Sequence, residues 1–176
     1  MSKSGCSISA TVSKKVMQDV LKAVHPTTYT QKATQMLNIV SQEGKNLINQ
    51  HYENAKTEYL EPLTCSVTAE RRGDSVRFKI EGKNILFAEY GAGISALGHP
   101  HPTGKYGIGT YPNQTHAFDP NGWYYTTNEQ GHRTKHIRDN IDGSSTYHTY
   151  GNKPLCFVYN AISTLKDRLT QIAKGI

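Results

Sequence analysis

Histidines offer the clearest opportunity for chemistry in this chain, because six of the eight lie between residues 94 and 153. Two of them form His99-Pro100-His101, a spacing that suits a pair of metal ligands. Neither a cysteine nor a carboxylate stands close by to complete a tetrahedral or facial-triad site. We therefore expect exposed loop histidines and predict no metal site, and a metal-dependent hydrolase stays as an alternative. The other histidines of this stretch are His116, His132, His136 and His148.

Two further patterns could carry chemistry, and turns explain both. The segment 104–110 looks like a phosphate-cradling loop but lacks the G-x-x-x-x-G-K-[ST] spacing. Asp139 and Asp142 could bind a metal with His136, but turn-forming residues surround them. No Ser/His/Asp or Cys/His arrangement has a supporting context. The sequence thus predicts no catalytic residue and no cofactor, and we expect a protein that is not an enzyme.

Composition limits the remaining classes of protein. The chain has 176 residues, of which 36% are hydrophobic and 19% charged, and its mean hydropathy is −0.61. These values suit one polar globular domain with a modest core. No apolar run is long enough to span a bilayer, and the N-terminus lacks the apolar segment of a secretory signal. We therefore expect no membrane partner.

Cysteine usage predicts that the chain is assembled in a reducing cytoplasm, and the distribution of charge disfavours a dedicated DNA-binding protein. Cys6, Cys65 and Cys156 form no C-x-x-C pair, which predicts free thiols in a reducing compartment, with Cys65 and Cys156 as small core residues. The net charge of +6 suggests contact with nucleic acid, but the basic residues are spread thinly along the chain. Because a dedicated DNA-binding protein concentrates positive charge on one surface, we expect weak backbone contact only. A small basic DNA-binding module stays as a second alternative.

Three helices are expected from the spacing of apolar residues. A four-residue step predicts a short helix over 12–24, which the residue before Pro26 ends. A longer helix is expected over 28–56, with Gly44 on its apolar stripe where another backbone can approach. The last helix should begin with Pro154 in its first turn. The apolar faces expected for the first and last helices are Val12, Val16, Val20 and Val24, and Val158, Ile162, Leu165, Leu169 and Ile172.

Between the helices the period changes to two, which predicts a small antiparallel β-meander. Its strands are expected over 64–70, 76–80 and 85–87, joined by turns at 72–74 and 81–84. From residue 94 to residue 153 this pattern breaks down, and only the segment 123–127 predicts a further strand. We expect most of this long insert to become ordered against a partner.

These elements together predict an α+β fold in which the helices pack on the β-meander. We expect a single domain over 1–176. Its parts are a helical N-terminal part (1–62), the β-meander (63–93), an extended insert (94–153) and a C-terminal helix (154–176).

Three sequence signatures have an order and spacing that no common enzyme shares. The first is Glu89-Tyr90-Gly91-Ala92-Gly93 at the end of the β-meander, and the second is Asn121-Gly122-Trp123-Tyr124-Tyr125 in the insert. The third precedes and enters the last helix and consists of Gly151, Pro154, Tyr159, Asn160 and Ala161. Over residues 10–175 the chain resembles the neck or head–tail joining proteins, of tail-completion type, of long-tailed bacteriophages. It departs from them in having Ala92 at a usual threonine position and a longer insert after Trp123.

The resemblance implies a structural virion protein of the phage neck. Such a protein forms a homo-oligomeric, six-fold ring between the head connector or head-closure protein and the tail-completion or tail-tube protein. Double-stranded DNA would pass through the lumen without being read, and the ring would be assembled in the host cytoplasm. Both the neck ring and the adjacent tail-completion ring remain open as its place.

Subunit contacts are expected at the first two signatures and at the residue that leads into the third. Glu89 could be either a surface residue at a strand end or a subunit contact. The aromatic side chains could either anchor a partner or pack locally within the insert. The expected interface residues are Glu89, Tyr90, Gly91, Gly93, Trp123, Tyr124, Tyr125 and Tyr150.

Overall fold

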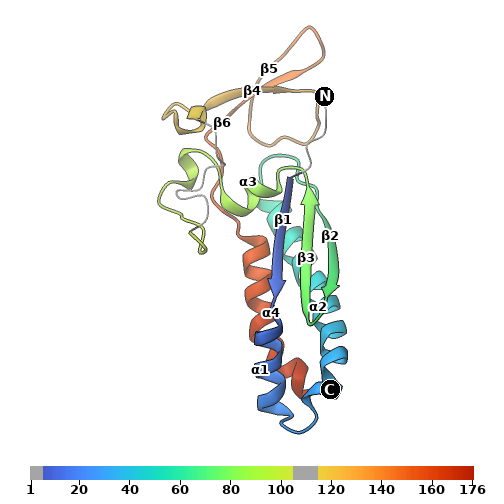
Figure 1. Cartoon of the computed structure of the whole chain (residues 1–176). Coiled ribbons are helices and arrows are strands. Elements are labelled where there is room, and N and C mark those ends of the chain that lie inside the picture. The colour runs from blue at the N-terminus through green and yellow to red at the C-terminus, as the bar shows by residue number, and fades with distance from the viewer. Residues whose placement is uncertain (1–5, 105–114) are drawn as a thin grey trace. The chain divides into compact units, whose positions relative to one another are not determined.

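The computed structural model describes residues 6–104 and 115–176 and confirms the α+β class, with 44% helix and 25% strand (Figure 1). The elements in chain order are β1 (Cys6–Val12), α1 (Lys14–Val24), α2 (Tyr29–Glu58), β2 (Ser66–Arg72), β3 (Ser75–Gly82), α3 (Ile85–Tyr90), β4 (Trp123–Thr127), β5 (Lys135–Asp139), β6 (Ser145–Thr149) and α4 (Phe157–Lys174). Two short 3-10 helices cover Ile94–Ala96 and Thr115–Phe118. Within the two described ranges, no helix is both long and apolar enough to cross a membrane.

Contacts within the chain divide it into two compact units. The helix–sheet unit comprises residues 7–53, 65–81 and 158–176. The junction unit comprises the described residues of 1–6, 54–64 and 82–157. Whether the chain folds as the single domain expected from its length stays a prediction.

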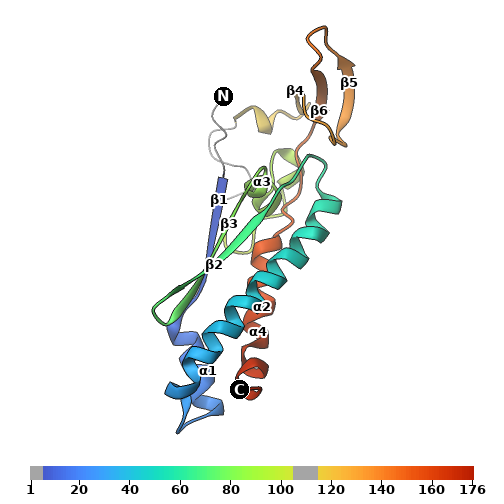
Figure 2. The same cartoon turned by 90° about the vertical axis from the view of Figure 1, so that its right-hand side faces the viewer.

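The helix–sheet unit contains a three-stranded sheet whose strand order is β1-β3-β2. Helices α2 and α4 lie along one face of this sheet (Figure 2). The hairpin of β2 and β3, which the alternating pattern predicts, pairs Val67 with Ile80 and Ala69 with Phe78. The inward-facing Phe78 and Ile80 are fully buried. The two-fold period of the sequence therefore identified the centre of this sheet correctly.

The prediction of a third strand at 85–87 is wrong, because these residues begin the helix α3. The third strand of the sheet is β1, which is the first element of the chain. Its signal was a weak alternation in which Ile8 and Val12 are buried, Ala10 is half-buried, and the exposed Ser9 and Thr11 lie between them. An apolar run of a few residues, such as Ile85-Leu86-Phe87, fits a short helix as well as a strand, so only tertiary contacts decide.

The three expected helices are confirmed, with two corrections. The side chains that α1 buries are Met17 and Leu21, whereas Val16 is 38% exposed. The reason is that Val12 ends β1 and Ser13 caps the helix, which shifts the apolar face by one residue. Helix α4 begins at Phe157, later than expected. Its predicted apolar face is buried except for Ile172, which is half-buried.

Gly44 allows close packing in the core of the helix–sheet unit, and we expect Gly44→Ala to destabilise this unit. A Cβ at this position would lie 2.2 Å from Cζ of Phe78 and 2.9 Å from Cδ2 of Leu165, and both of these side chains are fully buried. Overpacking of about 1–3 kcal/mol should outweigh a gain in helix propensity of about 1 kcal/mol. Urea unfolding followed by circular dichroism measures the difference. Asn49→Ala, on the exposed side of α2, is the control and should change little; a stabilised Gly44→Ala variant would contradict this packing.

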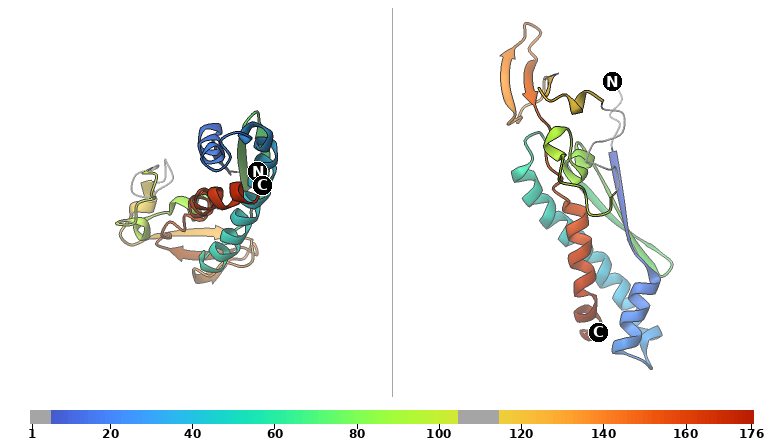
Figure 3. Two further views of the ribbon diagram at one scale, coloured as in Figure 1. Left: turned by 90° about the horizontal axis from the view of Figure 1, so that it is seen from below. Right: turned by 90° about the vertical axis from the view of Figure 1, so that its left-hand side faces the viewer.

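The junction unit contains a second three-stranded antiparallel sheet, whose order is β4-β6-β5. Figure 3 shows strands of this sheet in tan and orange. Strand β4 confirms the strand predicted for 123–127. Strands β5 and β6 lie in the part of the insert for which no strand was expected, so the prediction of a single further strand is wrong. Whether a partner is needed to order the insert stays a prediction. Their sequences, Lys-His-Ile-Arg-Asp and Ser-Thr-Tyr-His-Thr, lack the alternation of apolar and polar residues that predicts a strand. These strands are stabilised instead by pairs of side chains across neighbouring strands.

Candidate functional site

Three segments that the sequence singles out meet in the junction unit, and we call their meeting point the motif junction. The segments are residues 89–93, 121–125 and 150–154. Ala92 forms an isolated antiparallel bridge with Asn152. The backbone N–H of each donates to the carbonyl oxygen of the other, at 2.9 and 3.0 Å. The first signature is therefore joined through the backbone to the segment in which the third signature begins.

Two glycines make this close approach possible. Gly151 has a φ of +82°, and a Cβ there would lie 2.0 Å from the carbonyl oxygen of Ala92. Gly93 has a φ of +66°, and a Cβ there would lie 2.7 Å both from Cζ3 of Trp123 and from the carbonyl oxygen of Tyr150. Both the backbone conformation and the space favour a residue without a side chain. The contact of Gly93 with Trp123 brings the second signature to the same place.

Glu89 lies in the helix α3 and not at a strand end, so its interpretation as a strand-end surface residue is wrong. The side chains of Glu89 and His101 are each 2% exposed, and Oε1 of Glu89 lies 3.1 Å from Nε2 of His101. The backbone N–H of Thr103 donates to Nδ1 of His101 at 3.2 Å. An acceptor at Nδ1 places the proton of a neutral imidazole on Nε2, which then donates to the carboxylate. This buried pair ties α3 to the segment that ends at residue 104.

The histidines do not gather into one cluster. Among the described residues, no three His, Cys, Asp or Glu side chains stand close enough together to hold a metal ion. His99 is exposed, as expected. The same expectation is wrong for His101 and for His132, whose side chain is only 4% exposed. The segment 104–110 resembles a phosphate-binding loop in sequence, and its residues 105–110 lie outside the described residues.

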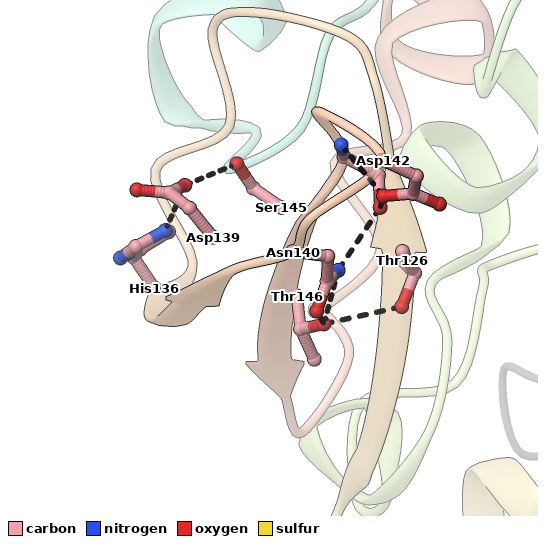
Figure 4. A network of polar contacts seen from close by, with 8 residues as sticks. Thr126, His136, Asp139, Asn140, Asp142, Ser145 and Thr146 are labelled. Carbon is pink, nitrogen blue, oxygen red and sulfur yellow. Dashed lines mark hydrogen bonds and ion pairs between the residues drawn. The ribbon is translucent and has the colours of Figure 1, made fainter.

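The acidic residues of the β5–β6 hairpin bind their own turn (Figure 4). Oδ1 of Asp139 accepts a hydrogen bond from the hydroxyl of Ser145 at 2.7 Å and lies 3.0 Å from Nε2 of His136. Oδ1 of Asp142 accepts from the hydroxyl and the backbone N–H of Ser144, at 2.6 and 3.0 Å. These hydrogen bonds hold the pKa of both carboxyl groups below its ordinary value. The turn accounts for both residues without a metal.

The second sheet sorts its aromatic side chains onto two faces that differ in exposure. On one face the ring of His148 lies 4.7 Å from that of Tyr124 and 4.8 Å from that of Tyr150. Tyr124 is 65% exposed and Tyr150 is 48% exposed. On the other face the rings of Tyr125 and Tyr147 stack at 5.6 Å. The period of two thus places one aromatic pair toward solvent and the other against protein.

A hollow of about 570 Å³ opens on the exposed aromatic face. Its lining combines aromatic rings with basic side chains and includes Tyr124, Tyr150, Arg133 and Lys135. The guanidinium of Arg133 donates to the carbonyl oxygen of Tyr59 and so is already engaged. Aromatic residues and arginine are both enriched at protein interfaces.

His132 holds the buried aromatic face in place. Its Nδ1 lies 2.9 Å from the hydroxyl of Tyr125, which in turn lies 2.6 Å from Oγ1 of Thr134. Its Nε2 has no hydrogen-bond partner among the described residues, and Oε2 of Glu129 is 4.0 Å away. Burial, and secondarily the charge of Lys83, lower the pKa of His132, so the ring is neutral near pH 7. The ring of Tyr125 is therefore fixed by a neutral partner.

A smaller hollow of about 210 Å³ lies beside the motif junction, and sequence reasoning missed it. Its lining residues are Tyr59, Glu61, Phe87, Ala92, Trp123, Tyr125, Gly151 and Asn152. Tyr59 and Glu61 belong to none of the signatures, and no spacing in the sequence links them to Trp123. Burial raises the pKa of Glu61, against the opposing effect of Lys83, and burial followed by Glu61 raises the pKa of Tyr59. Burial, with a smaller contribution from Glu61, also raises the pKa of Tyr125 to about 12.

The cysteines are free, and Cys65 and Cys156 are poorly suited to nucleophilic chemistry. Burial raises the pKa of both Cys65 and Cys156 to about 11, with nearby Glu53 and Glu89 respectively adding to the effect. A thiol with a raised pKa carries little of the reactive thiolate at neutral pH. Cys65 and Cys156 are half-buried, so the expected position in the core holds only in part.

The residues expected at a subunit interface fall into three groups by exposure. Those with buried side chains or backbone are Glu89, Tyr90, Gly91 and Gly93; those that are half-buried are Trp123 and Tyr125; those that are exposed are Tyr124 and Tyr150. Their role in an interface stays a prediction. The exposed pair has the most side-chain surface to offer a partner.

Comparison with known proteins adds no relative: no family model, no curated protein and no solved structure matches this chain.

Proposed function

We propose that this protein is a structural subunit of the neck of a long-tailed bacteriophage, where it forms a ring that joins the DNA-filled head to the tail. The observation that supports the proposal most is the motif junction. Its three segments are far apart in the sequence, yet they bond and pack against one another. This meeting supports the proposal for the first two signatures and for Gly151 and Pro154 of the third, whereas Tyr159, Asn160 and Ala161 belong to the helix–sheet unit.

The ring would have six copies and stack between the head connector or head-closure protein and the tail-completion or tail-tube protein. Double-stranded DNA would pass through its lumen. A net charge of +6 that is spread along the chain suits this passage, because many close phosphate contacts would retain the DNA. The protein would be assembled in the host cytoplasm and remain in the virion.

Subunit contacts would use the exposed aromatic face of the second sheet. Tyr124 and Tyr150 present large amphipathic rings there, and tyrosine is enriched among residues that dominate interface energies. The hollow of about 570 Å³ beside them could receive side chains of a neighbouring copy or ring. We therefore expect the double substitution Tyr124→Ser and Tyr150→Ser to weaken assembly by about tenfold or more without unfolding the chain.

Native mass spectrometry tests the proposal, with the protein alone and mixed with neck and tail-tube proteins. The expected result is a discrete ring, or entry into one with a neighbour, which the double tyrosine variant loses. Phe118→Ser is the control, because Phe118 is an exposed aromatic residue outside all three signatures. A strict monomer that ignores every candidate neighbour would overturn the proposal. No observation favours the metal hydrolase or the DNA-binding module over it.

A further inference from the structure

The small hollow of the junction unit has the size of a pocket for a single side chain. Its volume of about 210 Å³ lies below the roughly 300 Å³ at which sites for small-molecule ligands and cofactors begin. The tip of one long side chain fits such a space, whereas a nucleotide does not.

The charge that lines this hollow is negative. Glu61 is its one ionisable carboxyl group, and none of its lining residues is basic. No described residue donates a hydrogen bond to the carboxylate of Glu61. Lys83 is the cation whose charge reaches Glu61, but its ammonium group forms an ion pair with Glu129. The ammonium group of Lys83 is thus engaged by Glu129, and no described residue forms an ion pair with the carboxylate of Glu61.

The walls add a further acceptor and several aromatic rings. The side-chain N–H groups of Asn152 donate to the carbonyl oxygens of Phe87 and Lys153, both at 2.9 Å. This orientation leaves the amide oxygen of Asn152 as an acceptor on the wall. The rings of Phe87, Trp123 and Tyr125 line the same space. Aromatic faces attract cations, and together with a carboxylate they favour a cationic ligand that only donates hydrogen bonds.

Two of these rings are held in place before any ligand arrives. Trp123 packs against the backbone at Gly93, where even a Cβ would not fit. Tyr125 stacks on Tyr147, and its hydroxyl is bonded within the unit. A pocket whose walls are already rigid loses little conformational freedom when it binds.

We propose that this hollow, the Glu61 pocket, binds the guanidinium group of an arginine side chain presented by a partner protein. Guanidinium is planar, stacks on aromatic rings and has five donors in a fixed arrangement, which suits a carboxylate and an amide oxygen among aromatic walls. A lysine ammonium group has three donors and is held more strongly by water. The proposal does not depend on the neck assignment, since any arginine-bearing protein partner would serve.

Trp123 provides a direct measurement, because it is the only tryptophan of the chain and lines the pocket. The intact protein is titrated with N-acetyl-arginine methylamide while its tryptophan fluorescence is recorded. The matched ligands are the citrulline analogue, which is neutral and of nearly the same shape, the lysine analogue and putrescine. We expect saturable binding of the arginine compound and binding of citrulline that is weaker by about tenfold or more, because the pocket would lose its opposite charge.

Glu61→Gln tests the carboxylate, since it keeps the size of the side chain and removes the charge. This variant should lose at least about tenfold in affinity for the arginine compound and keep its unfolding transition. Glu58→Gln is the control: it removes an equal charge from an exposed position near the end of α2 and should bind as the unchanged protein does. Equal binding of citrulline, unaltered binding by Glu61→Gln, or no binding of the arginine compound would overturn the proposal. Preference for putrescine would overturn it in favour of a free diamine.

Discussion

Replacing Gly151 with alanine should destabilise the junction unit more than any other single methyl group added there. The new Cβ would lie 2.0 Å from the carbonyl oxygen of Ala92, at a φ of +82°. The left-handed backbone costs about 1–2 kcal/mol for a residue with a side chain. Relief of the clash would break the two hydrogen bonds between Ala92 and Asn152, at about 1 kcal/mol each. We expect a total loss of about 3–4 kcal/mol, a large part of the 5–15 kcal/mol typical of a domain.

Gly143→Ala is the matched control for this experiment. Gly143 has nearly the same φ, +80°, but no atom lies within 4 Å of its would-be Cβ. Its substitution therefore measures only the cost of the left-handed backbone for a residue with a side chain, about 1–2 kcal/mol. Urea unfolding followed by the fluorescence of Trp123 reports on the junction unit in both variants. Equal losses for the two variants would show that the contact of Gly151 with Ala92 contributes nothing.

Removal of the Glu89 carboxylate is the second change with a large expected effect. Glu89→Ala leaves the Nε2–H of His101 buried without this acceptor and creates a cavity in a place that is 2% exposed. A buried donor left without an acceptor costs about 1–3 kcal/mol, and the cavity adds to this cost, so we expect the free energy of unfolding to fall by about 3 kcal/mol. The same urea experiment measures it. The loss should be accompanied by faster hydrogen exchange in the segment before residue 104, which His101 holds against α3.

Glu89→Gln separates the hydrogen bond from the charge. The glutamine oxygen can still accept from His101, so this variant should lose about 1–2 kcal/mol less than Glu89→Ala. A double variant that also carries His101→Ala should lose less than the sum of the two single losses, because the residues share one interaction. Additive losses, or a Glu89→Ala variant as stable as the unchanged protein, would remove the pair from any account of the motif junction.

The elements that the sequence predicted well are those in which a local period repeats. Helices α2 and α4 carry an apolar stripe over several turns, and β3 alternates Val76, Phe78 and Ile80 with polar residues. Such patterns can be recognised without knowledge of distant residues, because one face of the element must be buried whichever element covers it. The predicted boundaries failed where two elements compete for one residue, as at Val12 between β1 and α1.

Short elements could not be predicted, because their form depends on contacts from elsewhere in the chain. The sequence of the six residues of α3 is compatible with a strand as well as with a helix. In the structure they are helical and bond to the segment 150–156, where the backbone N–H of Leu155 donates to the carbonyl oxygen of Ala88 at 2.8 Å. Strands β5 and β6 contain few apolar residues and are ordered by pairing with each other and with β4.

The sequence by itself determined the α+β class, the long helices, the β2–β3 hairpin and the identity of the three signatures. Only the tertiary structure decided that these signatures meet, that Glu89 is a buried partner of His101, and that Glu61 shares a pocket with Trp123. The physical reason is that periodicity reflects which face of one element is buried, which is a local property. Burial of a charge, the space at a glycine and the lining of a pocket depend on residues that folding brings together from distant parts of the chain.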